Sequence, residues 1–158
     1  HRKSLGVIKI NSESPIEFIN IIKKDRSKDS PPRWWYYFAI PDESVQSESN
    51  QIEVKSIRKK TFPIFGKVKS IEWKHNNYSE NLSDEFTRDT DINSLAMDIG
   101  DVKIESINKD FSGYKFTGYT IEIERKTWKD WANNKKISLD INQWKTLNKI
   151  ANLCIEFN

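Results

Sequence analysis

The stretch from Arg33 to Ile40 constrains the fold of this chain more than any other. It reads Arg-Trp-Trp-Tyr-Tyr-Phe-Ala-Ile, and every position after the arginine is apolar or aromatic. Such a run supplies apolar side chains to both faces of a strand, which is typical of a central β-strand covered on both sides. The aromatic rings would also suit base stacking, but the uninterrupted run favours core packing. It is far too short to span a bilayer, so we expect no membrane association.

Length and charge limit the function classes. The chain has 158 residues, enough for one domain or one domain with an extension. It carries 26 Lys and Arg and 23 Asp and Glu, a net charge of +3, which is well short of a polybasic chain. Its single Cys154 excludes an intrachain disulfide and a cysteine-rich zinc site. We see no signal peptide and expect an intracellular protein, in the cytoplasm or in the nucleoid or nucleus.

Local patterns predict an alternation of strands and helices. The expected elements are a strand at 5–10, a helix over 14–22, the strand 33–40, a hairpin of 52–60 and 64–73, a short helix near 83–86, strands around 102–104 and 119–123 with a turn at 108–113, a short helix starting at 127, and a helix after Asp140 with a capping box to Gln143. Residues 91–99 fit a helix or a strand. We expect a β-bulge at Gly118 and favour a final strand over 151–157.

These elements predict an α/β fold with a mixed central sheet flanked by helices. Residues 1–60 form a β-α-β extension of unknown role that packs on the same core. Residues 61–158 form the main domain, and its second half carries the informative chemistry.

Charged residues gather between Gly100 and Asp130. Asp101 opens one expected strand, and Glu124 and Lys126 lie on the next. Because side chains alternate along a strand, Glu124 and Lys126 share the face opposite the core, and a hairpin would place Asp101 beside Glu124. Carboxylate oxygens suit Mg²⁺, which activates a bound water and neutralises phosphate charge, while a lysine stabilises the charged transition state. The stretch therefore predicts phosphodiester cleavage with Mg²⁺ or Mn²⁺.

The pattern Gly100-Asp101, a hairpin, then Glu124-Arg-Lys126, three residues and Asp130 resembles the signature of the XPF family of structure-specific endonucleases, within the PD-(D/E)xK group. The resemblance covers roughly residues 70–157. It implies a restriction-endonuclease-like fold and a DNA-repair endonuclease that cuts branched or flap DNA. It further implies that Asp101 and Glu124 bind the metal, that Lys126 is catalytic, and that Asp130 supports the site. The upstream acidic position of the family has only one candidate here, Glu72.

Basic residues near the pattern suggest how DNA is held. Lys129, Lys135 and Lys136 are candidate phosphate contacts, or else a solvated face. Arg125 has the core-facing parity and is expected to form a supporting salt bridge. We expect weak DNA binding by this chain alone, with a homodimer or heterodimer partner supplying the rest.

Two alternatives to an active nuclease stay open. One is a catalytically silent nuclease-like module for DNA binding or dimerisation. The other is an unrelated α+β protein-interaction domain, in which Glu124 and Lys126 are surface charges.

Overall fold

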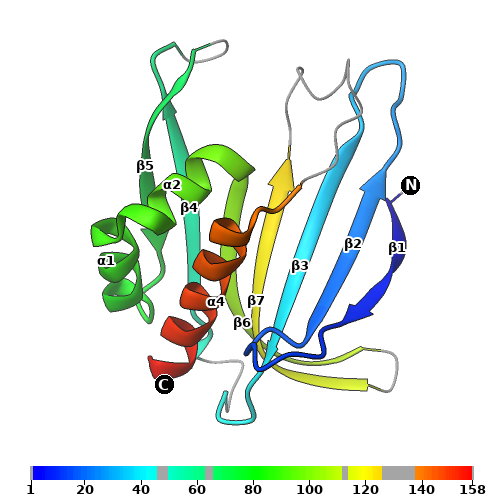
Figure 1. Cartoon of the computed structure of the whole chain (residues 1–158), viewed down its shortest axis with the longest axis vertical. Coiled ribbons are helices and arrows are strands. Elements are labelled where there is room, and N and C mark those ends of the chain that lie inside the picture. The colour runs from blue at the N-terminus through cyan, green and yellow to red at the C-terminus, as the bar shows by residue number, and fades with distance from the viewer. Residues whose placement is uncertain (1, 46–49, 63–65, 112–113, 126–137, 158) are drawn as a thin grey trace.

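A seven-stranded antiparallel sheet with helices on one face forms the structure (Figure 1). The computed structural model describes residues 2–45, 50–62, 66–111, 114–125 and 138–157. The strands are β1 (Arg2–Lys9), β2 (Phe18–Lys24), β3 (Arg33–Pro41), β4 (Glu53–Lys60), β5 (Val68–His75), β6 (Asp101–Phe111) and β7 (Tyr114–Arg125), and the helices are α1 (Glu80–Arg88), α2 (Thr90–Ile99) and α4 (Ile141–Glu156). Their order in the sheet is β1-β2-β3-β7-β6-β4-β5.

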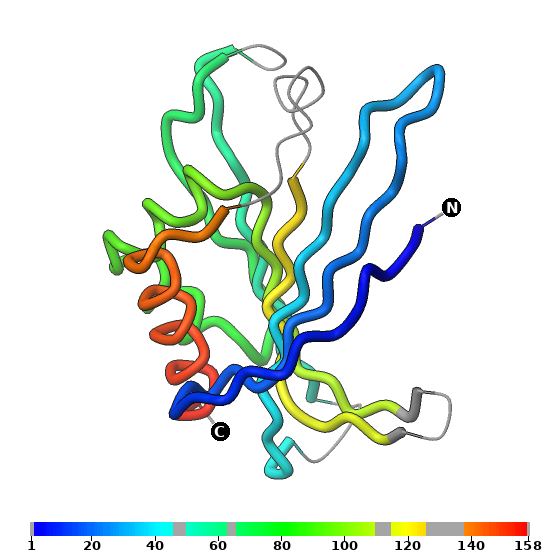
Figure 2. Tube along the Cα trace, turned by 45° about the vertical axis from the view of Figure 1, so that its right-hand side comes forward, coloured from blue at the N-terminus to red at the C-terminus, as the bar shows by residue number. Residues whose placement is uncertain are grey.

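Strand parity decides which face is buried. Phe38 of β3 lies opposite Ile121 of β7, which lies opposite Ile104 of β6. All three side chains are fully buried, and Phe38 packs at a tilt against Trp144 of α4, with ring centroids 6.4 Å apart. Figure 2 shows α1, α2 and α4 together on this side of the sheet. The other face, which carries the alternate side chains of the same strands, has no helix over it among the described residues.

The α/β class, the central strand and the hairpin of residues 52–73 are confirmed. β3 lies between β2 and β7, and β4 pairs with β5. The pairings are all antiparallel, whereas the sequence suggested a sheet of mixed direction. Strands from residues 1–60 and from residues 61–158 belong to this one sheet.

Four local predictions were wrong. The expected helix over 14–22 does not form, because residues 18–24 are β2, which pairs with both β1 and β3. No bulge forms at Gly118, and residues 108–111 of the expected turn belong to β6, because the β6–β7 register runs unbroken from Asp101 to Phe111; residues 112 and 113 lie outside the described residues. The final strand is also absent, because α4 continues to Glu156 and buries Leu147, Ile150, Ala151 and Cys154 at helical spacing.

Helix capping explains two other elements. The capping box predicted at Asp140 and Gln143 is present at the start of α4. The undecided segment 91–99 belongs to α2, because the Asp89 side chain accepts hydrogen bonds from the backbone N–H groups of Asp91 and Ile92. No helix within the described ranges is both long and apolar enough to cross a membrane.

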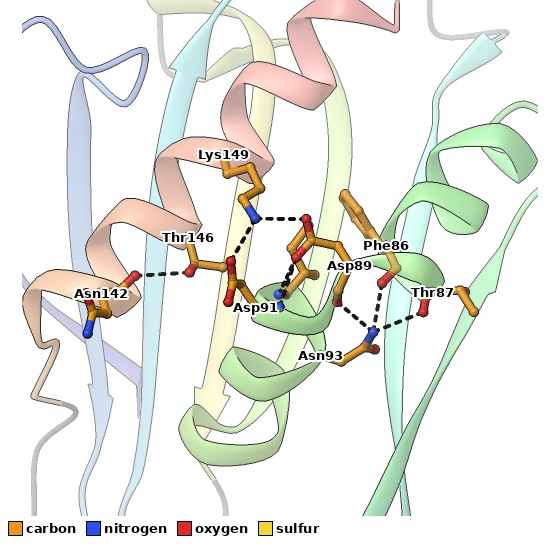
Figure 3. A network of polar contacts seen from close by, with 9 residues as sticks. Phe86, Thr87, Asp89, Asp91, Asn93, Asn142, Thr146 and Lys149 are labelled. Atoms are coloured by element: carbon orange, nitrogen blue, oxygen red, sulfur yellow. Dashed lines mark hydrogen bonds and ion pairs between the residues drawn. The ribbon is translucent and has the colours of Figure 1, made fainter.

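A polar network holds α4 against the start of α2 (Figure 3). The Lys149 ammonium donates to Asp89 Oδ2 at 2.8 Å and to Asp91 Oδ2 at 3.0 Å. The Asn93 amide donates to three carbonyl groups at the α1–α2 junction, including that of Asp89 at 2.8 Å. One carboxylate, Asp89, therefore both caps α2 and ties it to α4.

Replacing Asp89 by alanine is expected to lower the free energy of unfolding by about 1–2 kcal/mol at pH 7, the usual effect of losing an N-cap. Burial raises the pKa of Asp89, but the hydrogen bonds from Lys149 and from the Ile92 N–H outweigh it, so the pKa lies below its usual value. The folded state thus gains stability from the ionised carboxylate above the unfolded pKa of about 4, and loses it as the pH falls through the lower folded pKa.

Urea unfolding at pH 7 and pH 3 measures this effect. The difference in free energy of unfolding between the parent and Asp89→Ala should be smaller at pH 3 than at pH 7. The exposed Asp84 of α1 provides the control, since Asp84→Ala should change stability little. If the parent and Asp89→Ala differ by the same free energy of unfolding at both pH values, the charge of Asp89 does not stabilise the fold.

Candidate metal and phosphodiester site

Asp101 and Glu124 lie directly opposite each other on β6 and β7. Directly paired residues of an antiparallel sheet project to the same face, with Cβ atoms about 4.5–5.5 Å apart. Both side chains are partly buried, and that of Glu124 is 17% exposed. The structure therefore makes the pairing that strand parity predicts, on the helix-free face and at the end of the hairpin.

Gly100 explains why the pair can form where α2 enters β6. Its φ of 140° is a conformation that L side chains rarely adopt. A Cβ at this position would lie 2.5 Å from the Glu124 carbonyl oxygen. Only glycine thus lets the chain approach the end of β7 this closely, which gives the Gly-Asp dipeptide of the signature a structural reason.

Cations and an aromatic ring surround Glu124. The Arg33 guanidinium lies 3.9 Å from Glu124 Oε1. Trp35 is paired with Glu124 across β3 and β7 and is only 2% exposed. The Arg2 guanidinium lies over the Trp35 ring, 4.3 Å from its centroid, within cation–π range. The carboxylate pair is therefore bordered on the β3 side by a buried tryptophan and two arginines.

A third carboxylate, that of Glu122, lies two residues before Glu124 on β7 and on the same face. It is paired with Lys103 on β6 and with Tyr37 on β3. Burial raises the pKa of the Glu122 carboxyl; Lys103 opposes this, and nearby carboxylates add to it. Burial, followed by the charge of Glu122, raises the pKa of the Tyr37 hydroxyl. Glu122 is therefore half-buried in a polar cluster beside the pair.

Strand order separates Glu72 from the site. Glu72 lies on β5 opposite Ile57 of β4, and β4 in turn lies between β5 and β6. Two strand spacings, about 10 Å, therefore separate its strand from that of Asp101. Its carboxylate is 2.6 Å from the Lys59 ammonium. The structure does not bring Glu72 to the carboxylate pair.

Arg125 has the parity that the sequence predicted. It is paired with Trp34 of β3, which is 5% exposed and belongs to the core. The predicted catalytic Lys126, the supporting Asp130 and the candidate DNA contacts Lys129, Lys135 and Lys136 all lie outside the described residues. Within the described ranges, no three His, Cys, Asp or Glu side chains come together as a metal-binding group.

The larger hollows of the described surface lie away from this pair. One, of about 680 Å³, is lined by residues that include Glu17, Lys115 and Phe116. Another of the same volume lies along α4 beside Trp144 and Asn148. Neither Asp101 nor Glu124 lines either of these two hollows.

Sequence reasoning found the pair but missed Arg33, Tyr37 and Lys103 as its neighbours. The parity of β3 and β6 was available from the sequence, but the pairing of β3 with β7 was not. Comparisons with protein-family models, with curated proteins and with solved structures found no match.

Proposed function

We propose that this chain is a metal-dependent endonuclease that hydrolyses phosphodiester bonds of DNA, with Asp101 and Glu124 holding Mg²⁺ or Mn²⁺. The register of these two residues is the observation that carries the proposal. Two carboxylates on one face supply hard oxygen donors, which fit a divalent cation that keeps several of its waters. When bound, the metal would activate water and neutralise phosphate charge.

The residues around the pair have their own parts in this proposal. Arg33, beside Glu124, orients that carboxylate and adds positive charge near an incoming phosphate. Lys126 follows Arg125 directly in the sequence and is proposed to stabilise charge on the phosphate. We propose branched or flap DNA as the substrate, and we expect the reaction to take place inside the cell. Because the net charge is only +3, we expect a second subunit to supply further DNA affinity.

The proposal is supported by the residues of the carboxylate pair and not by the arrangement of the whole sheet. The resemblance implies a restriction-endonuclease-like sheet with a final strand near residues 153–156, where this chain has the last turns of α4. It also implies a third upstream acid, and Glu72 does not provide one. The proposal therefore depends on the carboxylate pair and on Lys126, and it is tested at those residues.

Lys126→Ala is expected to slow the cleavage of flap DNA in Mg²⁺ by about a hundredfold or more, as does the loss of one transition-state contact. Thermal unfolding and DNA binding should change little. Lys115→Ala, an exposed lysine at the other end of the same hairpin, is the matched control and should cut like the parent. Rates are compared on flap and linear duplex DNA, with and without EDTA. If Lys126→Ala cuts as fast as Lys115→Ala, the residue is a surface charge and the interaction-domain alternative is favoured.

A further inference from the structure

The two edges of the sheet differ in how they are protected. β5 forms one edge, and its largest apolar side chain is covered: Trp73 is 6% exposed and packs on Phe86 of α1, with ring centroids 5.1 Å apart. β1 forms the other edge, and all of its residues are exposed. Figures 1 and 2 show it at the margin of the sheet, away from the helices.

β1 exposes apolar side chains in addition to unpaired backbone groups. Leu5, Val7 and Ile8 are 58%, 63% and 50% exposed. Proteins usually protect such an edge with charges, proline or a covering element, because it can pair with another chain. A bulge between Ser4 and Gly6 and the charges of Arg2, Lys3 and Lys9 are devices of this kind, but they lie around the apolar centre and leave it uncovered. An edge of this kind is suited to the addition of a strand from a partner.

The charges on β1 indicate what kind of strand would fit. β1 carries Arg2, Lys3 and Lys9 and no acidic residue. At the start of β1, positively charged residues lie opposite other positively charged residues of β2: Arg2 lies opposite Lys24, and Lys3 lies opposite Lys23. Like charges directly opposite each other destabilise a sheet. Lys23 is compensated by Asp25 at 2.9 Å, and the remaining positive charge would be compensated by acidic side chains on an added strand.

We propose that β1 is a docking edge for an extended segment of a partner protein, which pairs with β1 and carries acidic residues on both sides of an apolar centre. A second copy of this chain fits less well. Antiparallel pairing of two β1 strands would bring Lys9 of one copy towards Arg2 and Lys3 of the other. DNA would match the charge, but it would leave Leu5, Val7 and Ile8 uncovered. This docking edge is separate from the proposed nuclease activity.

Fluorescence anisotropy with a defined probe tests the proposal. The probe is the labelled peptide Glu-Val-Thr-Val-Thr-Val-Thr-Glu, and a version with lysine at both ends is its counterpart. The acidic peptide should bind at least about tenfold more tightly, a difference typical of opposite against like charge at an interface. Combining Lys3→Glu with Lys9→Glu should reverse this preference. The same change at the opposite edge, Lys69→Glu with Lys74→Glu, should leave it unaltered.

Backbone pairing is tested separately from charge. Amide hydrogen exchange should slow in β1 and not in β5 when the acidic peptide is present. Val7→Pro removes one N–H and should weaken binding, while Val7→Ile keeps both the N–H and an apolar side chain and should bind like the parent; matched circular dichroism spectra would show that both variants fold. Three results would each overturn the proposal. The first is equal binding of both peptides, and the second is slowed exchange in β1 without peptide together with self-association of the chain in sedimentation. The third is slowed exchange in β1 with a 20-base-pair DNA duplex but not with the acidic peptide.

Discussion

Replacing Gly118 by alanine is expected to lower the free energy of unfolding by about 3 kcal/mol or more, the combined effect of backbone strain and overpacking. Gly118 has a φ of 151°. A Cβ there would lie 2.1 Å from the Ile40 carbonyl oxygen and 2.8 Å from the Asp42 nitrogen. Both obstacles are backbone atoms beside the β3–β7 pairing, so they cannot rotate away as a flexible side chain would.

Gly6 provides the matched control. Its φ is 125°, but a Cβ there would meet no atom within 4 Å. Gly6→Ala therefore carries conformational strain without a clash, and is expected to cost about 1–2 kcal/mol. Thermal and urea unfolding of the two variants separate these effects. Equal losses at Gly6 and Gly118 would show that β3 and β7 do not approach as closely as the structure places them.

Replacing Asp101 by asparagine is expected to remove divalent-cation binding and to slow DNA cleavage by at least about a thousandfold, because metal-dependent charge stabilisation contributes several kcal/mol. Asparagine keeps the size of the side chain but removes the negative charge that attracts Mg²⁺. The fold should be retained, since Asp101 is only partly buried and lies on the helix-free face. Calorimetry with Mn²⁺ and cleavage rates in Mg²⁺ measure the two effects.

Asp98→Asn is the control for this experiment. Asp98 is an exposed aspartate on α2, three residues before Asp101, and carries the same charge into the same part of the sequence. It should bind Mn²⁺ and cut DNA like the parent. Loss of activity in both variants would show a general effect of charge. Loss of activity in neither variant would show that Asp101 does not belong to the site.

The pairing of β6 with β7 at the site could be predicted from the sequence, because its signals are local. The alternation of Ile121 and Ile123 with Glu122 and Glu124 fixes which side chains share a face. A hairpin then leaves little choice in register, so the pairing of Asp101 with Glu124 followed. The capping box at Asp140 was equally local.

The remaining features depend on contacts between distant segments. Ser14 and Pro15 give the same local signal whether a helix follows or not, and the pairing of β2 with both β1 and β3 decided for a strand. Residues 151–157 were apolar enough for either structure, and packing against the core made them helical. The position of Glu72 depended on β4 lying between β5 and β6, an order that no pattern along the chain specifies.

Nuclear magnetic resonance with Mn²⁺ tests most directly whether Asp101 and Glu124 form a metal site. A paramagnetic ion broadens the signals of nearby amides, so it reports where the ion binds independently of catalysis. At millimolar Mn²⁺ or below, the amides of Asp101 and Glu124 should broaden first, and Asp101→Asn should abolish this effect. Broadening centred on Asp89 and Asp91, or broadening at the pair that persists in Asp101→Asn, would contradict the account.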